Sequence, residues 1–147
     1  MKIVIGSDHA GFSLKESCRT FLEKSGAHQV TDRGVFSAES SDYPKIAHNV
    51  AQSVAKGEFD RGILICGTGI GMSIVANRYK GVRAAACHHL FSAKMSRLHN
   101  DANVLTMGSR VVGEGLALEI LDIFLETPFE GGRHGRRVEQ IDEGVRD

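Results

Sequence analysis

The sequence predicts an α/β protein, a Rossmann-like, doubly wound three-layer sandwich around a five-stranded parallel sheet. Short apolar runs alternate five times with segments whose apolar residues recur at helical spacing, and the links between them are short. Residues 62–66 are apolar without a break, which is typical of a central parallel strand covered on both faces. Parallel strands need crossover connections, which the helical segments supply. We therefore expect one domain over residues 1–147.

Each element has a local signal. The β-branched run at residues 3–5 opens the chain as a strand, Gly26 is a plausible stop for the helix that follows, and Pro44 stands where a second helix begins, because its missing N–H costs least there. Strands are expected at residues 3–5, 28–31, 62–66, 82–86 and 103–107, and helices at 12–22, 44–57, 72–79, 91–98 and 113–125. The polar tail, residues 131–147, could form a short helix from Arg133.

Composition excludes several classes of protein. The 147 residues are 41% hydrophobic, which is ordinary for a globular protein, and 18 Lys+Arg balance 18 Asp+Glu. No overall basic field exists to hold nucleic acid or an anionic membrane, so we expect neither as a partner. Three cysteines without a CxxC pair argue against a disulfide framework and a thiolate zinc site. The first apolar run is too short for a signal peptide, and no run reaches the ~18 residues of a membrane span. We expect a cytoplasmic protein.

Three alternating glycines, Gly67, Gly69 and Gly71, stand between the apolar strand and the next helix. Such a turn brings several backbone N–H groups close to one point, which makes a site for an anion or an oxyanion. The alternative is a tight turn with glycine for geometry alone. The pattern is GxGxG rather than the GxGxxG of dinucleotide-binding folds, and no Lys-Ser/Thr pair follows as in a Walker loop.

Cys66 ends the strand directly before this loop. Amides at that position favour the thiolate, which can act as a nucleophile or a general base, although a cysteine there could also be a small buried residue. Elsewhere the sequence places Asp8 and His9 after the first strand, and the basic cluster 133–137 in the tail, where Arg133 and Arg137 would lie one helical turn apart.

Six ordered blocks of residues together resemble the family of type B ribose-5-phosphate isomerases, which is shared with the subunits of galactose-6-phosphate isomerase. The blocks are Ser-Asp-His-Ala-Gly-Phe at 7–12, Ser-Asp-Tyr-Pro at 41–44, Ile-Cys-Gly-Thr-Gly-Ile-Gly at 65–71, His-Asn-Asp-Ala-Asn at 99–103, Gly-Ser-Arg-Val-Val-Gly at 108–113 and Phe-Glu-Gly-Gly-Arg-His at 129–134. The resemblance runs from Lys2 to about Asp142.

The resemblance implies an aldose–ketose isomerase that needs neither a metal nor a cofactor and interconverts ribose 5-phosphate and ribulose 5-phosphate through a cis-enediolate. It makes Cys66 the base that moves a proton between C2 and C1, with Thr68 beside it, and His99 the group that opens the furanose ring. It also assigns ligands of the oxyanion, the sugar and the phosphate: the loop amides at Gly67, Gly69, Ile70 and Gly71; Asp8, Tyr43 and Asn100; and His9, Arg110, Arg133 and Arg137.

The resemblance further implies a homodimer, in some relatives a tetramer, whose active sites are shared between subunits, with the tail 131–147 packing on the partner subunit. Two alternatives stay open at this point. One is the same chemistry on allose 6-phosphate, galactose 6-phosphate or a tetrulose phosphate. The other is a non-catalytic, flavodoxin-like nucleotide-binding module, against which the missing GxGxxG pattern and the absence of Trp count. A cysteine hydrolase is less favoured than either alternative, because the sequence has no convincing Cys–His–Asp/Asn order for this fold.

Overall fold

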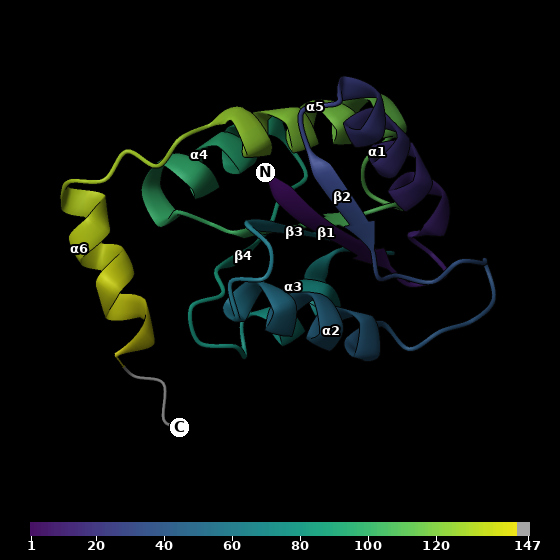
Figure 1. The fold of residues 1–147 in the computed structure, drawn as a ribbon, viewed down its shortest axis with the longest axis horizontal. Helices are drawn as coiled ribbons and strands as arrows, with labels where there is room; N and C mark the ends of the chain where they lie inside the picture. The colour runs from purple at the N-terminus through teal and green to yellow at the C-terminus, as the bar shows by residue number, and fades with distance from the viewer. Residues whose placement is uncertain (144–147) are drawn as a thin grey trace.

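A computed structural model describes residues 1–143 as a parallel sheet between two layers of helices (Figure 1). The sheet has five strands in the order β2-β1-β3-β5-β4, and all neighbouring pairs are parallel. The strands are β1 (Lys2–Ser7), β2 (Gln29–Asp32), β3 (Arg61–Cys66), β4 (Ala84–Ala86) and β5 (Val104–Gly108). The predicted fold class is therefore confirmed.

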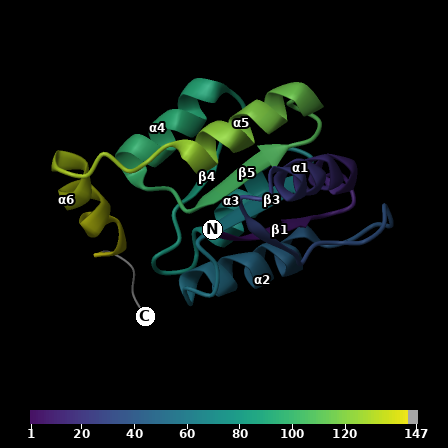
Figure 2. The ribbon, with the colours of Figure 1, turned by 45° about the horizontal axis from the view of Figure 1, so that its top comes forward.

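The helices divide between the two faces of the sheet, as Figure 2 shows. α1 (Phe12–Ser25), α4 (Leu90–Asn100) and α5 (Glu114–Glu126) cover one face, and α2 (Tyr43–Ala55) and α3 (Ile70–Ala76) cover the other. The chain continues as α6 (Arg133–Glu139) and the short 3-10 helix η1 (Gln140–Asp142). Among residues 1–143, no helix combines the length and the apolar character that crossing a membrane requires.

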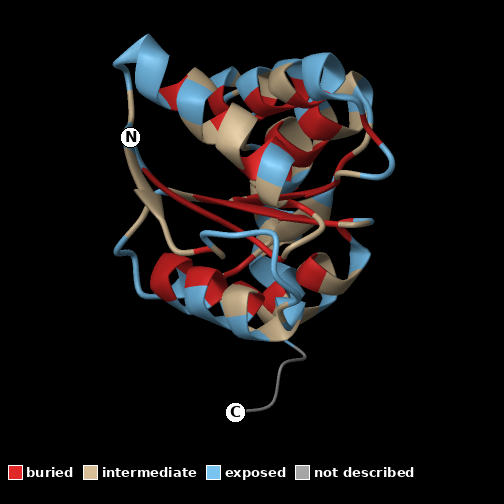
Figure 3. Cartoon of the chain, turned by 90° about the vertical axis from the view of Figure 1, so that its right-hand side faces the viewer, coloured by how far each residue is buried: buried red, intermediate tan, exposed pale blue. Residues whose placement is uncertain are grey.

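Side-chain alternation along the strands builds two cores. In β3, Ile63 and Ile65 face the layer of α1, α4 and α5, whereas Leu64 and Cys66 face α2 and α3. Both sets are buried, and the strands form the buried centre of the molecule in Figure 3. The uninterrupted apolar run of β3 is thus explained by burial on both faces.

Most element boundaries follow the sequence signals closely. Gly26 ends α1 in the left-handed conformation, with φ of 64°, and Pro44 lies in the first turn of α2. α3 begins at Ile70 rather than at residue 72, because the last residues of the glycine loop already form its first turn. β4 is only three residues long: its register with β5 begins at Ala84, and before it the carbonyl of Arg83 accepts the N–H groups of Asn103 and Val104.

Lys15 is among the largest fully buried side chains, and it joins α1 to the end of β2. Its Nζ forms an ion pair with Asp32, whose side chain is 13% exposed, and a second one with Glu16 at 2.9 Å. The ring of Phe36 lies over the ammonium group, with its centroid 5.4 Å away. A buried ammonium is stable only when it is paired, so Asp32 is the residue that permits Lys15 in this position.

Candidate active site

The carboxyl ends of β1, β3 and β5 lie together at one edge of the sheet. Backbone hydrogen bonds continue past the strand ends: the Asp8 N–H donates to the carbonyl of Ile65 at 3.2 Å, and the Ser109 N–H donates to that of Cys66 at 2.9 Å. The chain leaves β1 for α1 on one face and β3 for α3 on the other. In open α/β sheets, ligands bind where the connections diverge in this way.

Cys66 lies at this point, as the last residue of β3, with only 5% of its surface exposed. Its Sγ accepts a hydrogen bond from the Gly69 N–H at 3.1 Å. The next amide in the loop, the Ile70 N–H, donates to Oγ1 of Thr68 at 3.3 Å. The thiol therefore lies at the end of β3 with a backbone amide directed at its sulfur.

The glycine loop lies directly on the backbone of β5. Gly69 has φ of 76°, and a Cβ on it would lie 2.9 Å from the carbonyl carbon of Met107. A Cβ on Gly108 would lie 2.7 Å from the backbone of Thr68. The close approach of the two backbones therefore requires glycine at both positions. The alternative in which the glycines serve turn geometry alone predicts the same requirement. The consequence for chemistry is that the loop amides are held against a rigid strand.

Two of the predicted substrate ligands lie against the same loop. The Arg110 N–H donates to the carbonyl of Gly67 at 3.1 Å, and the guanidinium lies over this glycine, with Nη1 3.5 Å from where a Cβ would be. The ring of Tyr43, at the start of α2, approaches Gly71 so closely that a Cβ there would lie 2.7 Å from it. A cationic and a phenolic side chain therefore flank the amides beside Cys66.

Asp8 and His9 complete this edge of the sheet. Asp8 is 7% exposed, and its Oδ1 accepts the Gly11 N–H at 3.0 Å. His9 and Ser41 are joined twice: the Ser41 N–H donates to Nδ1 of His9 at 3.2 Å, and the His9 N–H donates to Oγ of Ser41 at 3.1 Å. Because Nδ1 of His9 is occupied, its Nε2 is the nitrogen left to meet a ligand.

The remaining predicted residues form a second group elsewhere. His99 and Asn100 are the last two residues of α4, so they lie within the helix and not after it as the sequence suggested. Together with Arg137 of α6 they line a pocket of about 300 Å³. Arg133, also on α6, does not line this pocket, and its Nε donates to Nε2 of His134 at 3.4 Å.

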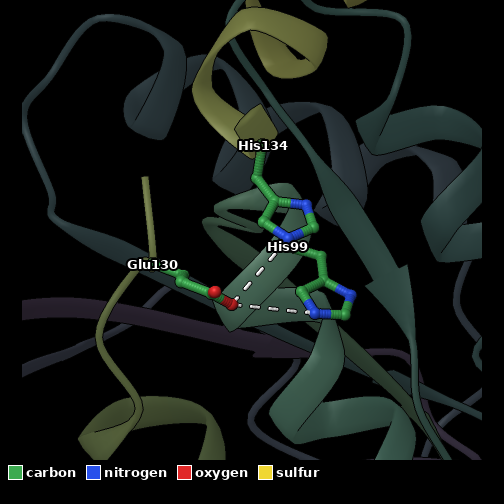
Figure 4. A group of neighbouring side chains, drawn as sticks. All are labelled: His99, Glu130 and His134. Atoms are coloured by element: carbon green, nitrogen blue, oxygen red, sulfur yellow. Dashed lines mark ion pairs between the residues drawn. The ribbon is translucent and has the colours of Figure 1, made fainter. Parts of the chain in front are cut away.

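His99 and His134 stack in parallel, with ring centroids 4.2 Å apart and planes inclined by 8°. Nε2 of each lies close to Oε2 of Glu130, at 3.9 Å and 3.8 Å respectively (Figure 4). Burial, and then the neighbouring His99, lower the pKa of His134. Within residues 1–143, this is the group of side chains whose donor atoms lie near enough together to suit a metal ion. Parallel rings do not converge on one point, however, and Arg133 already bonds His134.

The two groups lie at opposite edges of the sheet. α4 leads from the carboxyl end of β4 back to the amino end of β5, so His99 at its C-terminus lies at the amino edge. Asn103 marks that edge, because its carbonyl accepts the N–H of Gly62 near the start of β3. Cys66 lies at the other end of β3, about 13 Å further along at 3.3 Å per residue. One chain therefore does not bring His99, Asn100, Arg133 and Arg137 to Cys66.

The sequence did not indicate several of the residues that contribute to these two groups. Glu130 and His134 are four residues apart, but Glu130 precedes α6, so no helical spacing links them. Ser109 donates from its hydroxyl to the carbonyl of Ala10 at 2.7 Å and so ties the end of β5 to the loop after β1. The sequence indicates only that Thr106 is a β-branched strand residue, yet in the structure its hydroxyl donates to the Gly69 carbonyl of the glycine loop. Such long-range bonds leave no trace in local spacing.

Comparisons with known proteins show the family to which the chain belongs. The chain is 53% identical over 140 residues to ribose-5-phosphate isomerase B of Escherichia coli, which covers 95% of the chain and 93% of that protein. It is 43% identical over 142 residues to a D-erythrulose-4-phosphate isomerase of Pectobacterium atrosepticum, covering 96% and 93%. The solved structure of Clostridium thermocellum ribose-5-phosphate isomerase B superposes with a TM-score of 0.95 at 54% identity, covering 97% of this chain and 96% of the other. Because the model of the ribose/galactose isomerases also matches residues 3–141, the chain belongs to that family.

Proposed function

We propose that the chain interconverts ribose 5-phosphate and ribulose 5-phosphate, with Cys66 as the base. The observation that carries the proposal is the position of the Cys66 thiol, buried at the end of β3 with the Gly69 N–H directed at Sγ from 3.1 Å. Membership of an isomerase family, at 53% identity to a ribose-5-phosphate isomerase over nearly the whole chain, supports the substrate.

The chemistry needs one base, one oxyanion site and one group that opens the sugar ring. The thiolate of Cys66 removes the proton from C2, the O1 oxygen takes up negative charge, and the cis-enediolate forms. A proton then passes from O2 to O1, and the same thiol returns its proton to C1, so that C1 becomes an alcohol carbon and C2 a ketone. The aldehyde carbon is reduced as the neighbouring carbon is oxidised, so the step needs no external oxidant or reductant. We assign the amides of Gly69, Ile70 and Gly71, in the loop that follows Cys66, to hold the enediolate oxygen, and the first of them lies beside the thiol, because it donates to Sγ.

The separation of the two groups of residues supports a site shared between subunits of a homodimer. His99, Asn100, Arg133 and Arg137 would reach the Cys66 loop of the partner subunit, where His99 opens the ring and the arginines hold the phosphate. α6 is placed for this role, because it extends beyond α4 and away from the sandwich (Figure 1). Residues 131–143 of the predicted partner-binding tail are described, and 144–147 lie outside the described residues.

Mixing two inactive variants tests the shared site. Cys66→Ala disables one group and Arg137→Ala disables the other, so a hybrid dimer holds one intact site. Random exchange between two symmetric dimers makes about half of them hybrids, which restores about a quarter of the unmutated activity. The matched control mixes Cys66→Ala with Arg110→Ala. Both of these residues lie at the carboxyl edge, so every hybrid site stays defective and activity stays absent. Equal recovery in both mixtures, or recovery in neither after exchange is verified, contradicts the shared site.

A second candidate is the same chemistry on a tetrulose phosphate, because the chain is 43% identical to a D-erythrulose-4-phosphate isomerase. A coupled assay compares kcat/KM for ribose 5-phosphate, erythrulose 4-phosphate, allose 6-phosphate and galactose 6-phosphate, with EDTA present. Preference for ribose 5-phosphate, lost in Cys66→Ala, is the expected result. Preference for another sugar keeps the base and the loop and changes the substrate. No turnover of any sugar phosphate refutes the isomerase.

We place this reaction among the steps of pentose phosphate metabolism in the cytoplasm. The cellular compartment is supported by the cysteines: Cys18, Cys66 and Cys87 are all free thiols, and all three are buried. Free thiols are typical of reducing compartments.

A further inference from the structure

We propose that Thr106 is a positioning residue for the isomerisation: its hydroxyl holds the Gly69 carbonyl and thereby directs the amides around Cys66. The proposal begins from burial. Thr106 is fully buried in β5, on the same face as Val104, where its neighbours belong to the aliphatic core beneath α2 and α3. Valine has nearly the same shape and would fill this position without a polar group. Because the Thr106 hydroxyl is buried among apolar side chains, it needs a hydrogen-bond partner to offset the cost of its burial.

That partner is the glycine loop. Oγ1 of Thr106 donates to the Gly69 carbonyl oxygen at 2.9 Å, a bond between residues 37 positions apart in the chain. Gly69 is also the residue whose N–H donates to Sγ of Cys66 at 3.1 Å. Gly69 therefore links the two side chains, with its carbonyl bonded to Thr106 and its N–H bonded to the Cys66 sulfur.

The planarity of the peptide bond carries the effect further. In a trans peptide the C=O and the following N–H point in opposite directions. Because Thr106 draws the Gly69 carbonyl toward the sheet, the Ile70 N–H points away from the sheet, toward the hydroxyl of Thr68 at 3.3 Å. Ile70 is 56% exposed, so this amide lies at the open side of the loop, where a bound sugar can reach it.

The first turn of α3 alone does not fix this orientation. The Gly69 carbonyl also accepts the Ser73 N–H at 3.1 Å, which is an ordinary helical bond. That bond sets the carbonyl relative to α3, but it does not set α3 relative to the sheet. α3 is seven residues long, too short to be stable without tertiary contacts. The hydroxyl of Thr106 links the first turn of α3 to β5.

The test compares Thr106→Val, which keeps the shape and removes the hydroxyl, with Thr106→Ser, which keeps the hydroxyl. We expect Thr106→Val to lower kcat about tenfold or more, a fraction of what deleting an oxyanion donor costs, with little change in KM. Thr106→Ser restores most of kcat. The kinetic part rests on the proposed isomerase activity.

Alkylation supplies a readout that needs no substrate. Iodoacetamide labelling of Cys66 near neutral pH, followed by mass spectrometry of its peptide, slows several-fold in Thr106→Val, because the thiolate loses a well-directed donor. The matched control is Ser53→Ala: Ser53 is also buried and donates to the Val50 carbonyl at 2.8 Å, but it lies in the last turn of α2. We expect Ser53→Ala to change stability and to leave both kcat and the labelling rate of Cys66 unchanged.

The outcomes are distinct. Thr106→Val with kcat and labelling rate both within twofold of the unmutated protein shows that Thr106 only fills its position, and the proposal fails. Failure of Thr106→Ser to restore the labelling rate also overturns it. If Thr106→Val does not fold, Thr106→Ala removes the hydroxyl without setting a methyl group against the carbonyl, and the same two criteria apply. If no sugar phosphate is turned over, the proposed function fails while the labelling rates still decide the role of Thr106.

Discussion

Gly69→Ala tests whether close packing holds the loop that presents the amides to Cys66. Alanine at φ of 76° costs about 1–2 kcal/mol, because L side chains rarely adopt this region. Its Cβ would also lie 2.9 Å from the carbonyl carbon of Met107, and displacing a packed backbone adds about 1–3 kcal/mol. The stiffer unfolded chain returns about 0.4–1 kcal/mol. We expect the free energy of unfolding to fall by about 2–4 kcal/mol. We also expect kcat to fall, because displacing the loop moves its amides away from Cys66.

Two further glycines separate the contributions. Gly57 has φ of 71° and open space around it, so Gly57→Ala measures the conformational cost alone, about 1 kcal/mol. The Cβ of Gly108→Ala would lie 2.7 Å from the Thr68 backbone, and Gly108 has no positive φ. This variant therefore measures the cost of crowding alone. Urea unfolding at one fixed protein concentration gives the free energies, with the slope m checked for each variant. If Gly69→Ala is no less stable than Gly57→Ala, the loop does not press on β5 and the reasoning is refuted.

Two more predictions concern ionisable groups. Asp32→Asn leaves the ammonium of Lys15 buried without its main counter-charge and lowers the free energy of unfolding by about 3–5 kcal/mol. Glu16→Gln, which removes the more exposed partner, costs less than about 1 kcal/mol by urea unfolding, and equal losses would contradict the assignment. The pKa of His134 is lowered chiefly by burial, so the folded state favours the neutral ring. The stability this gives to α6 is present above the ordinary histidine pKa of ~6.5 and is lost as the pH falls. The protection factors of the α6 amides, which correct for the intrinsic pH dependence of exchange, should therefore fall at acid pH, and protection factors that do not change would contradict the prediction.

The strands and helices could be predicted because their signals are local. The apolar run of β3, the left-handed Gly26 and Pro44 each act within a few residues of the chain, and the structure places elements where these signals indicate. The insertion of β5 between β3 and β4 has no local signal, because strand order depends on which crossovers pack best. The sequence predicted five parallel strands but not their order.

The candidate site was predictable to a similar degree. The position of Cys66 before the glycine loop follows from a strand, a turn and a helix in succession, and the structure confirms that arrangement. The assignment of His99 to the same reaction came from resemblance alone, and its place at the opposite edge follows from the direction of α4. The link from Thr106 to the loop joins residues distant in the chain, so no spacing rule could have indicated it.

The order of the strands also affects when the protein becomes functional during synthesis. β4 leaves the ribosome before β5, yet β5 is its one partner in the sheet. β1, β2 and β3 can associate as soon as they emerge, whereas β4 has no edge to join until β5 inserts beside β3. The surface on which the loop after Cys66 rests is supplied by that same late strand. The thiol is therefore made early, but the loop that surrounds it has no strand to pack on until β5 has been synthesised and has joined β3.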